Sequence, residues 1–356
     1  MKLLIFTQKV DSEDSVLGFF HTWIREISSR VESVEVICLE KGQENKQLDL
    51  PKNVIVYSLG KSQHQSEARY GARKIFTKIK YVINLYHYLF LICGSYDRIF
   101  VHMNHEYVLL AGLYWKIKNI PVYLWRNHPR GSMATRIAVF LSTKVFATST
   151  ESFTARFKKT IIMPVGIDTN IFKTLEGIVR KKYSVLMLGR ISPVKHIELA
   201  IETIRYLVSS GVQVSLSIVG SPPPRDIEYY NNLRQTVTDN NLSTNITFED
   251  EVTKEKAPEI FSSHEICLNL TESGSFDKTI VEATACGAIP LVSNKSLIGL
   301  LPKVCVTENN PEAIAHSLER LLDPHEQMEI QQKLKSFAES QSLSVLMDKL
   351  FIELAE

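Results

Sequence analysis

The sequence predicts an α/β protein built from two Rossmann-like domains, each a doubly wound parallel sheet. Short apolar runs alternate with helical patterns through the first half of the chain, and the same alternation starts again near residue 183. A chain of 356 residues is also too long for one ordinary core and suits two domains. The boundary is expected near 172–182, where the sequence is polar and lacks strong periodicity.

The first half supplies the first series of elements. Its strands are predicted from short apolar runs, typical of buried parallel strands, and its helices from apolar residues three or four positions apart. The strands are expected over 1–7, 31–40, 54–58, 98–103 and 121–126. The helices are expected over 19–29, 81–93 and 107–118, and a polar loop over 8–15 follows the first strand.

The second half repeats this pattern. Its strands are expected over 183–190, 213–220, 245–250, 265–271 and 288–294, with a helix over 196–210 and a last helix around 344–355. In doubly wound sheets, ligands bind at the carboxyl ends of the strands. The residues that directly follow each strand are therefore the candidates for chemistry.

The composition excludes several classes of protein. With 44% hydrophobic and 22% charged residues, the chain is neither disordered nor fibrous. The longest apolar stretch, 81–96, is interrupted by Asn84 and His87 and is shorter than the ~20 residues of a spanning helix. The apolar run 3–6 is too short for a secretory signal. Five cysteines without a C-x-x-C spacing indicate reduced, buried thiols, so we expect a cytoplasmic protein.

Charge is distributed unevenly between the two halves. Residues 1–175 carry 24 Lys and Arg against 14 Asp and Glu, and the remainder carries 17 against 25. A basic first half suggests an anionic partner, such as a membrane surface or a phosphorylated substrate. It is equally compatible with two domains that have different surfaces. No motif of interleaved aromatic and basic residues supports nucleic-acid binding.

Two cations follow the first strand of the second half. In GRISPVKH (189–196), Arg190 comes directly after the strand and Lys195 lies near the start of the next helix. Cations at a strand end, next to a helix N-terminus, form a site suited to a diphosphate. Taken alone, the segment is better explained as a loop with a solvated Arg and Lys, because Gly-Arg and Pro-x-Lys are common.

A second segment, GSFDKTIVEATACG (274–287), strengthens this interpretation. It is a Gly/Ser loop followed by a helix, with Asp277 as the expected N-cap. Free backbone N–H groups at that turn would face an anion, and the Glu282 carboxylate could accept hydrogen bonds from a vicinal diol such as a ribose. Together the two segments predict a nucleoside-diphosphate site.

These segments resemble the family 4 retaining glycosyltransferases of the GT-B fold (glycosyl transferases group 1). GRISPVKH is similar to the family's G-R-x-x-x-x-K motif, 274–294 to its E-x7-E loop and following strand, and PVGIDTNIF (164–172) to a segment before its interdomain linker. The resemblance implies an acceptor-binding domain over 1–175 and a nucleotide-sugar-binding domain over 176–340. These would face a central cleft, with a C-terminal helix, 341–356, packing back on the first domain.

The resemblance also implies roles for individual residues. Arg190 and Lys195 would neutralise the leaving diphosphate, and His128, which follows a strand, would lie at the reaction centre. The donor-binding residues would be Gly18, Gly220, Glu251, Val252, Gly274, Ser275, Phe276, Asp277, Lys278, Thr279 and Glu282. His102, Asn104 and His105, at the end of a strand, would line the acceptor site. Asp168 is expected to brace the segment before the linker.

The sequence departs from the family pattern at one position that bears on the sugar. The first Glu of E-x7-E falls on Gly274, and either Glu272 or Asp277 could replace its carboxylate. Gly18 also sits later than the family's glycine loop. A weakened or altered activity is therefore one of the possibilities that the sequence leaves open.

Metal ions and other cofactors are not expected. The chain contains no D-x-D, and H-x-x-H-E at 102–106 is not the zinc-protease order H-E-x-x-H. The substrate would be a nucleotide-diphosphate sugar. The resemblance implies retention of the anomeric configuration and transfer to a glycan or lipid-linked acceptor in cell-surface polysaccharide or glycolipid synthesis.

The basic stretch 61–80, followed by the apolar run 81–92, could lie on an anionic membrane, which would place the protein on the inner face of the plasma membrane. A solvated helix followed by a core helix explains the same pattern. Two further functions also remain open: a nucleotide-sugar epimerase, and a non-catalytic protein that binds a sugar nucleotide.

Overall fold

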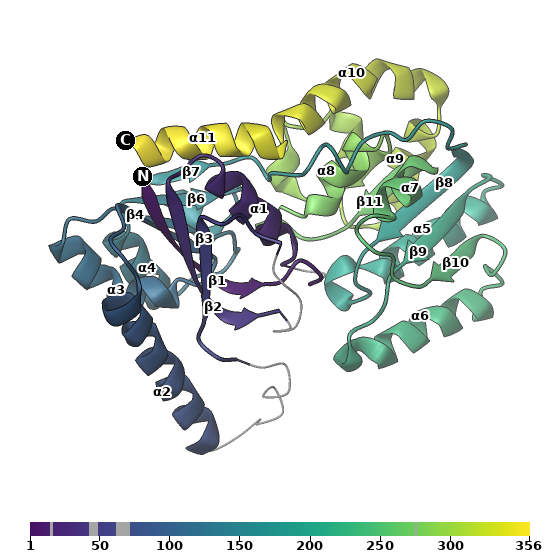
Figure 1. Cartoon of the computed structure of the whole chain (residues 1–356). Helices are drawn as coiled ribbons and strands as arrows, with labels where there is room; N and C mark the ends of the chain where they lie inside the picture. Colours follow the sequence, from purple (N-terminus) through teal and green to yellow (C-terminus); the bar gives the residue numbers. More distant parts are fainter. Residues whose placement is uncertain (15–16, 43–48, 62–71, 275) are drawn as a thin grey trace. The chain divides into compact units, whose positions relative to one another are not determined.

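The computed structural model describes residues 1–14, 17–42, 49–61, 72–274 and 276–356. It divides the chain into two compact units (Figure 1). Unit 1 comprises Met1–Ala147, Ser152–Met163 and Lys349–Glu356, and unit 2 comprises Thr148–Glu151 and Pro164–Asp348. Each unit contains its own parallel sheet and hydrophobic core. This is the two-domain α/β architecture that the sequence predicts.

Unit 1 contains a parallel sheet with the strand order β3-β2-β1-β4-β5-β6-β7. The strands are β1 (Lys2–Val10), β2 (Ser33–Lys41), β3 (Val54–Ser58), β4 (Arg98–His102), β5 (Val122–Trp125), β6 (Lys144–Ala147) and β7 (Thr160–Ile162). Its helical segments are α1 (Phe19–Ser28), α2 (Ala72–His87), the π-helical η2 (Tyr88–Ile92), α3 (Glu106–Ile117), α4 (Met133–Leu141) and the 3-10 turn η3 (Phe153–Arg156).

The helices of unit 1 cover both faces of this sheet. The connections β3–α2–β4, β4–α3–β5 and β5–α4–β6 cross the sheet in one direction, and β1–α1–β2 crosses in the other. Right-handed crossovers therefore place α2, α3 and α4 on one face and α1 on the opposite face. The first face buries Phe6 against Trp115 of α3, and the second packs Trp23 of α1 on Trp125.

Unit 2 contains a parallel sheet with the order β10-β9-β8-β11-β12. The strands are β8 (Lys181–Leu188), β9 (Ser215–Val219), β10 (Ile246–Glu249), β11 (His264–Asn269) and β12 (Ile289–Val292). The α-helices are α5 (Ile197–Ser209), α6 (Ile227–Asp239), α7 (Ala257–Ser262), α8 (Lys278–Ala285), α9 (Pro311–Leu321) and α10 (Pro324–Ser340). Short 3-10 turns are η4 (Pro193–Lys195), η5 (Pro224–Asp226), η6 (Lys295–Leu297) and η7 (Lys303–Cys305).

The last helix, α11 (Leu343–Ala355), contributes residues to both units. Its first turns belong to unit 2, where Leu343 donates its backbone N–H to Ile167 O. From Lys349 onward it belongs to unit 1, where Leu354 O accepts a hydrogen bond from Arg98 and Lys144 Nζ lies 2.9 Å from Glu353 Oε2.

The structure differs from the predicted elements in several places. The change of unit falls between Met163 and Pro164 rather than near 172–182, because Val165, Ile167 and Phe172 are buried in the core of unit 2. The predicted loop 8–15 is wrong at its start, since β1 continues to Val10. Strands β6 and β7 and helix α4 were not predicted, and α2 begins earlier than residue 81.

The burial of the cysteines follows the prediction in part. Cys38, Cys267, Cys286 and Cys305 are buried and free, whereas Cys93 is half-buried. Within the part of the chain that the structure describes, no helix combines the length and the apolar character needed to cross a membrane.

Candidate functional site

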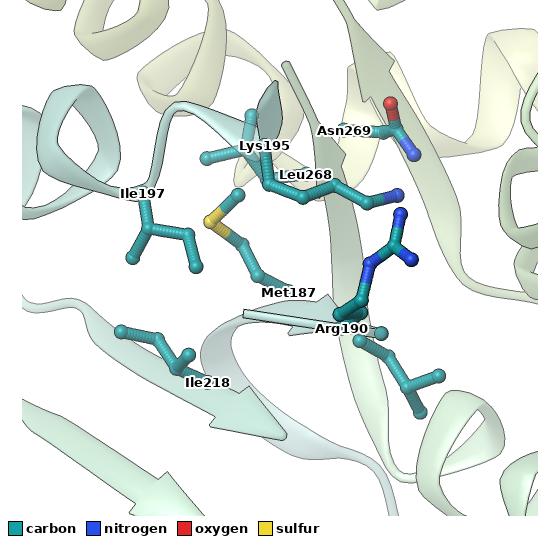
Figure 2. Close-up of a pocket in the computed structure, with 9 residues that line it drawn as sticks. Met187, Arg190, Lys195, Ile197, Ile218, Leu268 and Asn269 are labelled. Carbon is teal, nitrogen blue, oxygen red and sulfur yellow. The ribbon is translucent and has the colours of Figure 1, made fainter. Parts of the chain in front are cut away.

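A pocket opens at the carboxyl ends of β8, β9 and β11 in unit 2 (Figure 2). The order of the sheet reverses between β8 and β11, and such a switch point is where doubly wound sheets bind ligands. The pocket measures about 290 Å³, including the part open to solvent, and apolar side chains such as Met187, Ile218 and Leu268 form its wall. Figure 2 shows the polar ends of Arg190, Lys195 and Asn269 pointing toward the same region.

The backbone that carries Arg190 depends on two glycines. Gly189 has φ +133° and Gly220 has φ +151°, a range that side-chain-bearing residues rarely adopt. A Cβ on Gly220 would lie only 2.0 Å from Gly189 O. The strand ends β8 and β9 can therefore approach closely here, and Ile191 N–H donates to Ser221 O at 3.1 Å. This contact fixes the turn from which Arg190 projects.

Lys195 is held by a polar network at the start of α8. Its ammonium group donates to Asp277 Oδ2, which also accepts from Asn269 Nδ2 at 3.0 Å. The other oxygen, Asp277 Oδ1, accepts from Thr279 N–H at 3.2 Å and from the Thr279 hydroxyl at 2.9 Å. Asp277 therefore caps α8, as predicted, and ties Lys195 of η4 to the end of β11.

An acidic side chain neutralises Lys195, whereas Arg190 has no such partner among the described residues. Burial alone would raise the pKa of Asp277, but the charge and hydrogen bond of Lys195, together with those of its other donors, lower that pKa to about 2. Asp277 is thus ionised at neutral pH and offsets Lys195. Arg190 is exposed, and no side chain in the described ranges forms an ion pair or hydrogen bond with it. Its guanidinium is therefore the uncompensated cation of the pocket.

One turn into α8, Lys278 and Glu282 form a second charged group. They lie four positions apart on the helix, and each is half-buried. Burial lowers the pKa of Lys278 and raises the pKa of Glu282, while the attraction between the two charges opposes both shifts. Lys254 also acts on both groups electrostatically. No hydrogen bond reaches the Glu282 carboxylate from the described residues, so its oxygens remain available to hydroxyl donors.

Comparison with known proteins identifies the kind of domain that holds this pocket. Residues 168–341 match the family model described as glycosyl transferases group 1. Residues 168–341 are a group 1 domain, and the chain is a glycosyltransferase. No curated protein sequence gives a significant match to it.

Solved structures resemble the glycosyltransferase over its whole length. HepE from Anabaena in complex with UDP is 18% identical, with a TM-score of 0.76 and coverage of 100% of both chains. Sucrose-phosphate synthase from Thermosynechococcus elongatus is 16% identical, with a TM-score of 0.75 and coverage of 99% of this chain and 98% of that one. Trehalose-6-phosphate synthase OtsA is 11% identical, with a TM-score of 0.75 and coverage of 100% and 99%. At these identities the likeness establishes the shared GT-B fold.

Some predicted donor residues of the glycosyltransferase have structural roles. Gly274 has φ +106°, so a glutamate at this position would strain the backbone, and the missing carboxylate reflects a different loop path. The Phe276 side chain is buried and stacks on Phe337 at 6.3 Å, which removes it from the pocket. The Gly220 position is explained by its close approach to Gly189. Ser275 lies outside the described residues.

Three other predicted positions lie at loops. Glu251 and Glu272 are exposed, and Val252 packs partly against the core of unit 2.

Asp277 cannot readily replace the missing carboxylate, because its oxygens already bind Lys195 and the start of α8. Asp168 braces its turn as predicted, since its Oδ1 accepts from Asn170 N–H at 3.0 Å.

The predicted residues of unit 1 belong to a separate part of the structure. Gly18 begins α1 with an ordinary helical φ of −57°, and a Cβ there would lie 2.5 Å from Asp14 O. His102 is 2% exposed and stacks on Phe20 at 4.0 Å. The expected acceptor contact of His102 is therefore wrong for its side chain, which is part of the core between α1 and β4.

The two neighbouring acceptor candidates and His128 are more accessible. Asn104 and His105 are half-buried at the end of β4, after Met103, which has φ +69°. The pKa of His105 is lowered by burial, and the nearby charge of Arg126 acts in the same direction. His128 is exposed after β5, and its Nδ1 accepts from Arg130 N–H at 3.0 Å. Nε2 forms no hydrogen bond with the residues that the structure describes.

Sequence reasoning missed one residue that lines the pocket and one that acts on the charged group of α8. Asn269 holds both Asp277 and Thr279, and Lys254 acts on the Lys278–Glu282 pair. Asn269 could have been found, because it is the polar last residue of a buried strand, a position that faces the switch point. Lys254 lies in a loop after β10, and nothing in its local sequence connects it with α8.

Proposed function

We propose that the chain transfers a sugar from a UDP-sugar and is a retaining, family 4 enzyme. The observation that carries the proposal is the pair Arg190 and Lys195 at the mouth of the unit 2 pocket, inside the matched domain 168–341. HepE, a structural neighbour, has been solved with UDP and with UDP-glucose. The uridine nucleotide is thus the first donor to test.

The proposed chemistry rests on charge developing on the leaving diphosphate. Arg190 is uncompensated and exposed, so it can contact the phosphates directly. Lys195 remains oriented by Asp277 and adds a second positive charge. Preorganised donors aimed at developing charge typically contribute about 10²–10³ in rate each. Because these cations carry out the task, we propose that no metal ion or other cofactor is required.

Other residues would hold the rest of the donor. The oxygens of Glu282 are suited to the two ribose hydroxyls, and the attraction of Lys278 opposes the rise that burial causes in the pKa of Glu282. The backbone N–H groups at the start of α8 add the positive end of a helix dipole. Glu251 and Val252, after β10, remain our candidates for contacts with the base.

We propose a glycan or lipid-linked acceptor, in the synthesis of a cell-surface polysaccharide or glycolipid. Asn104, His105 and His128 of unit 1 are the candidates for contacts with the acceptor and the transferred sugar. The protein would work in the cytoplasm, on the inner face of the plasma membrane, with the stretch 61–90, of which 62–71 lie outside the described residues, at the lipid surface.

A second candidate is a non-catalytic protein that binds a sugar nucleotide. The observation that favours it is Gly274, whose backbone conformation leaves no place for the family's first glutamate. The two candidates share the donor site and differ in turnover. Hydrolysis of the donor or transfer to added glycans separates them, and interconversion of free UDP-sugars without an acceptor would indicate an epimerase.

The deciding experiment measures thermal shift with UDP, GDP and ADP, using wild type, Arg190→Ala and Arg205→Ala. Arg205 is an exposed arginine on α5 that pairs with Glu202 away from the pocket, and so is a matched control. A shift with UDP in wild type and Arg205→Ala, but not in Arg190→Ala, supports the proposal. An equal shift in all three proteins, or in none, contradicts it.

A further inference from the structure

Three helices lie side by side on one face of the unit 1 sheet (Figure 1). The Tyr86 hydroxyl of α2 donates to Leu110 O of α3 at 2.8 Å, and Phe90 of η2 meets Tyr114 edge-on at 5.0 Å. On the other side of α3, Lys116 Nζ lies 4.0 Å from the ring centre of Phe140 on α4. The three helices therefore form one continuous layer.

Each helix of this layer carries an apolar stripe that faces away from the sheet. The exposed stripe residues follow helical spacing, at 76, 79 and 83 on α2, 110, 113 and 117 on α3, and 133, 137 and 140 on α4. Together with residues of η2 they form what we term the apolar face: Phe76, Ile79, Ile83, Phe90, Leu91, Ile92, Leu110, Leu113, Ile117, Met133, Ile137 and Phe140. Several of these side chains are about 70% exposed, including Phe76, Ile117 and Met133.

The apolar face is additional to the core. The same helices bury other side chains against the sheet, such as Leu85 of α2, Val108 of α3 and Ala138 of α4. Contiguous exposed apolar surface is uncommon in soluble monomers and usually marks an interaction site. A helix that is apolar on both sides is therefore expected to contact a second apolar environment on its exposed side. The stripes are therefore not explained by the packing of unit 1.

The part of the chain that carries the apolar face is predominantly basic. Between residues 68 and 150 the sequence contains twelve Lys and Arg but only two acidic residues, Asp97 and Glu106. Of the basic residues, Lys78 and Lys80 on α2, Lys116 and Lys118 at the end of α3, and Arg136 on α4 are exposed. Asp97 accepts from the Lys2 backbone N–H at 2.8 Å, at the start of the sheet.

We propose that α2, η2, α3 and α4 together form a docking face that lies on an anionic lipid bilayer. The apolar side chains would enter the boundary between headgroups and acyl chains, and the surrounding cations would meet lipid phosphates. A bilayer fits better than a protein partner, because the exposed cations are spread over all three helices, whose one acidic residue in the sequence, Glu106, lies in the first turn of α3. The inference extends the lipid contact from the basic stretch 61–90 to α3 and α4, and does not depend on the donor pocket.

The test uses the surface of α4, which lies outside the 61–90 stretch. Wild type and the variant Met133→Ser/Ile137→Ser/Phe140→Ser are sedimented with vesicles of phosphatidylcholine alone or mixed with phosphatidylglycerol. The matched control is Val179→Ser/Met328→Ser, which removes exposed apolar side chains of unit 2. We expect wild type and the control to bind the mixed vesicles and the α4 variant to bind at least about tenfold more weakly. Binding should also fall at high salt.

A charge-reversal variant, Lys116→Glu/Lys118→Glu, repeats the test without removing apolar surface, and thermal unfolding checks that each variant is folded. Failure of wild type to bind, equal binding by the α4 variant, or equal binding to neutral vesicles would each overturn the proposal. A wild-type dimer that the α4 variant abolishes, without any effect of lipid, would assign the face to a second copy of the chain. The UDP thermal shift is measured on the same variants, so the outcome for the docking face stays separate from that for the donor site.

Discussion

Lys195 and Asp277 form an ion pair that joins the turn after β8 to the N-cap of α8. Both side chains are 18% exposed, and Asn269 supports the carboxylate from the end of β11. The pair thus sets the direction of a cation that the proposed reaction uses. It also partly cancels that cation, so the phosphate site is less positive than its two basic residues suggest.

The variant Asp277→Asn should lower stability by about 2 kcal/mol at neutral pH, as the downward shift of its pKa indicates. Asparagine also caps helices, so the loss isolates the charge. The folded-state pKa of Asp277, about 2, lies below the ordinary aspartate value of 3.8. The stabilisation is therefore present above about pH 4 and is lost as the pH falls through about 2. Urea unfolding of both proteins between pH 6 and pH 2 measures this, and a difference that does not change with pH would refute the prediction.

Gly220→Ala should destabilise unit 2 and weaken donor binding together. Its Cβ would press on Gly189 O at 2.0 Å and shift the turn that carries Arg190. Gly211→Ala is the matched control, because Gly211 has φ +80° but no atom within 4 Å of the added Cβ. We expect the control to cost about 1 kcal/mol from backbone strain alone, and Gly220→Ala at least about 2 kcal/mol more. Equal losses of unfolding free energy would show that the strand ends relax freely.

Glu282→Gln should weaken UDP binding by about tenfold, the usual cost of losing a charged hydrogen-bond acceptor. The structural reason is that the carboxylate oxygens have no hydrogen-bond donor among the described residues. A sharper test measures the affinities of wild type and Glu282→Gln for UDP and for 2′-deoxy-UDP by titration calorimetry, as a thermodynamic cycle. If Glu282 binds the ribose, the two losses will not add. Additive losses of binding free energy would show that Glu282 does not contact the ribose 2′-hydroxyl.

His128→Ala should reduce turnover by about 10² while leaving the affinity for UDP unchanged. His128 is an exposed residue of unit 1, whereas the donor pocket lies in unit 2. His325→Ala, an exposed histidine on α10, is the control. Initial rates and UDP titrations on both variants check this, and a loss of UDP affinity in His128→Ala alone would assign the histidine to nucleotide binding.

Much of the fold was predictable because buried parallel strands are continuous apolar runs. β3 was predicted over the same residues that the structure shows, and β4 and β5 within a residue or so at each end. The short strands β6 and β7 give too little signal, and α4 was missed because MATRIAVFL is apolar on both sides and so shows no clear periodicity.

Residues whose role depends on distant partners could not be predicted. Lys9 looks like the start of a polar loop, yet it continues β1 because it forms ion pairs with Asp14 at 2.8 Å and Glu40 at 3.2 Å. The pairing of Lys195 with Asp277 spans 82 positions, and the stacking of Phe276 on Phe337 joins α10 to the loop before α8. Local sequence indicated where the phosphate cations lie, but not which neighbour orients them.

The shared helix α11 affects how the chain folds during synthesis. Unit 1 includes residues 349–356, which leave the ribosome after all of unit 2 has been made. All strands of the unit 1 sheet are translated early, within residues 2–162, but the contacts of Arg98 and Lys144 to α11 are missing until the end. Unit 1 is thus translated first, but it gains its last tertiary contacts only after all of unit 2 has been translated.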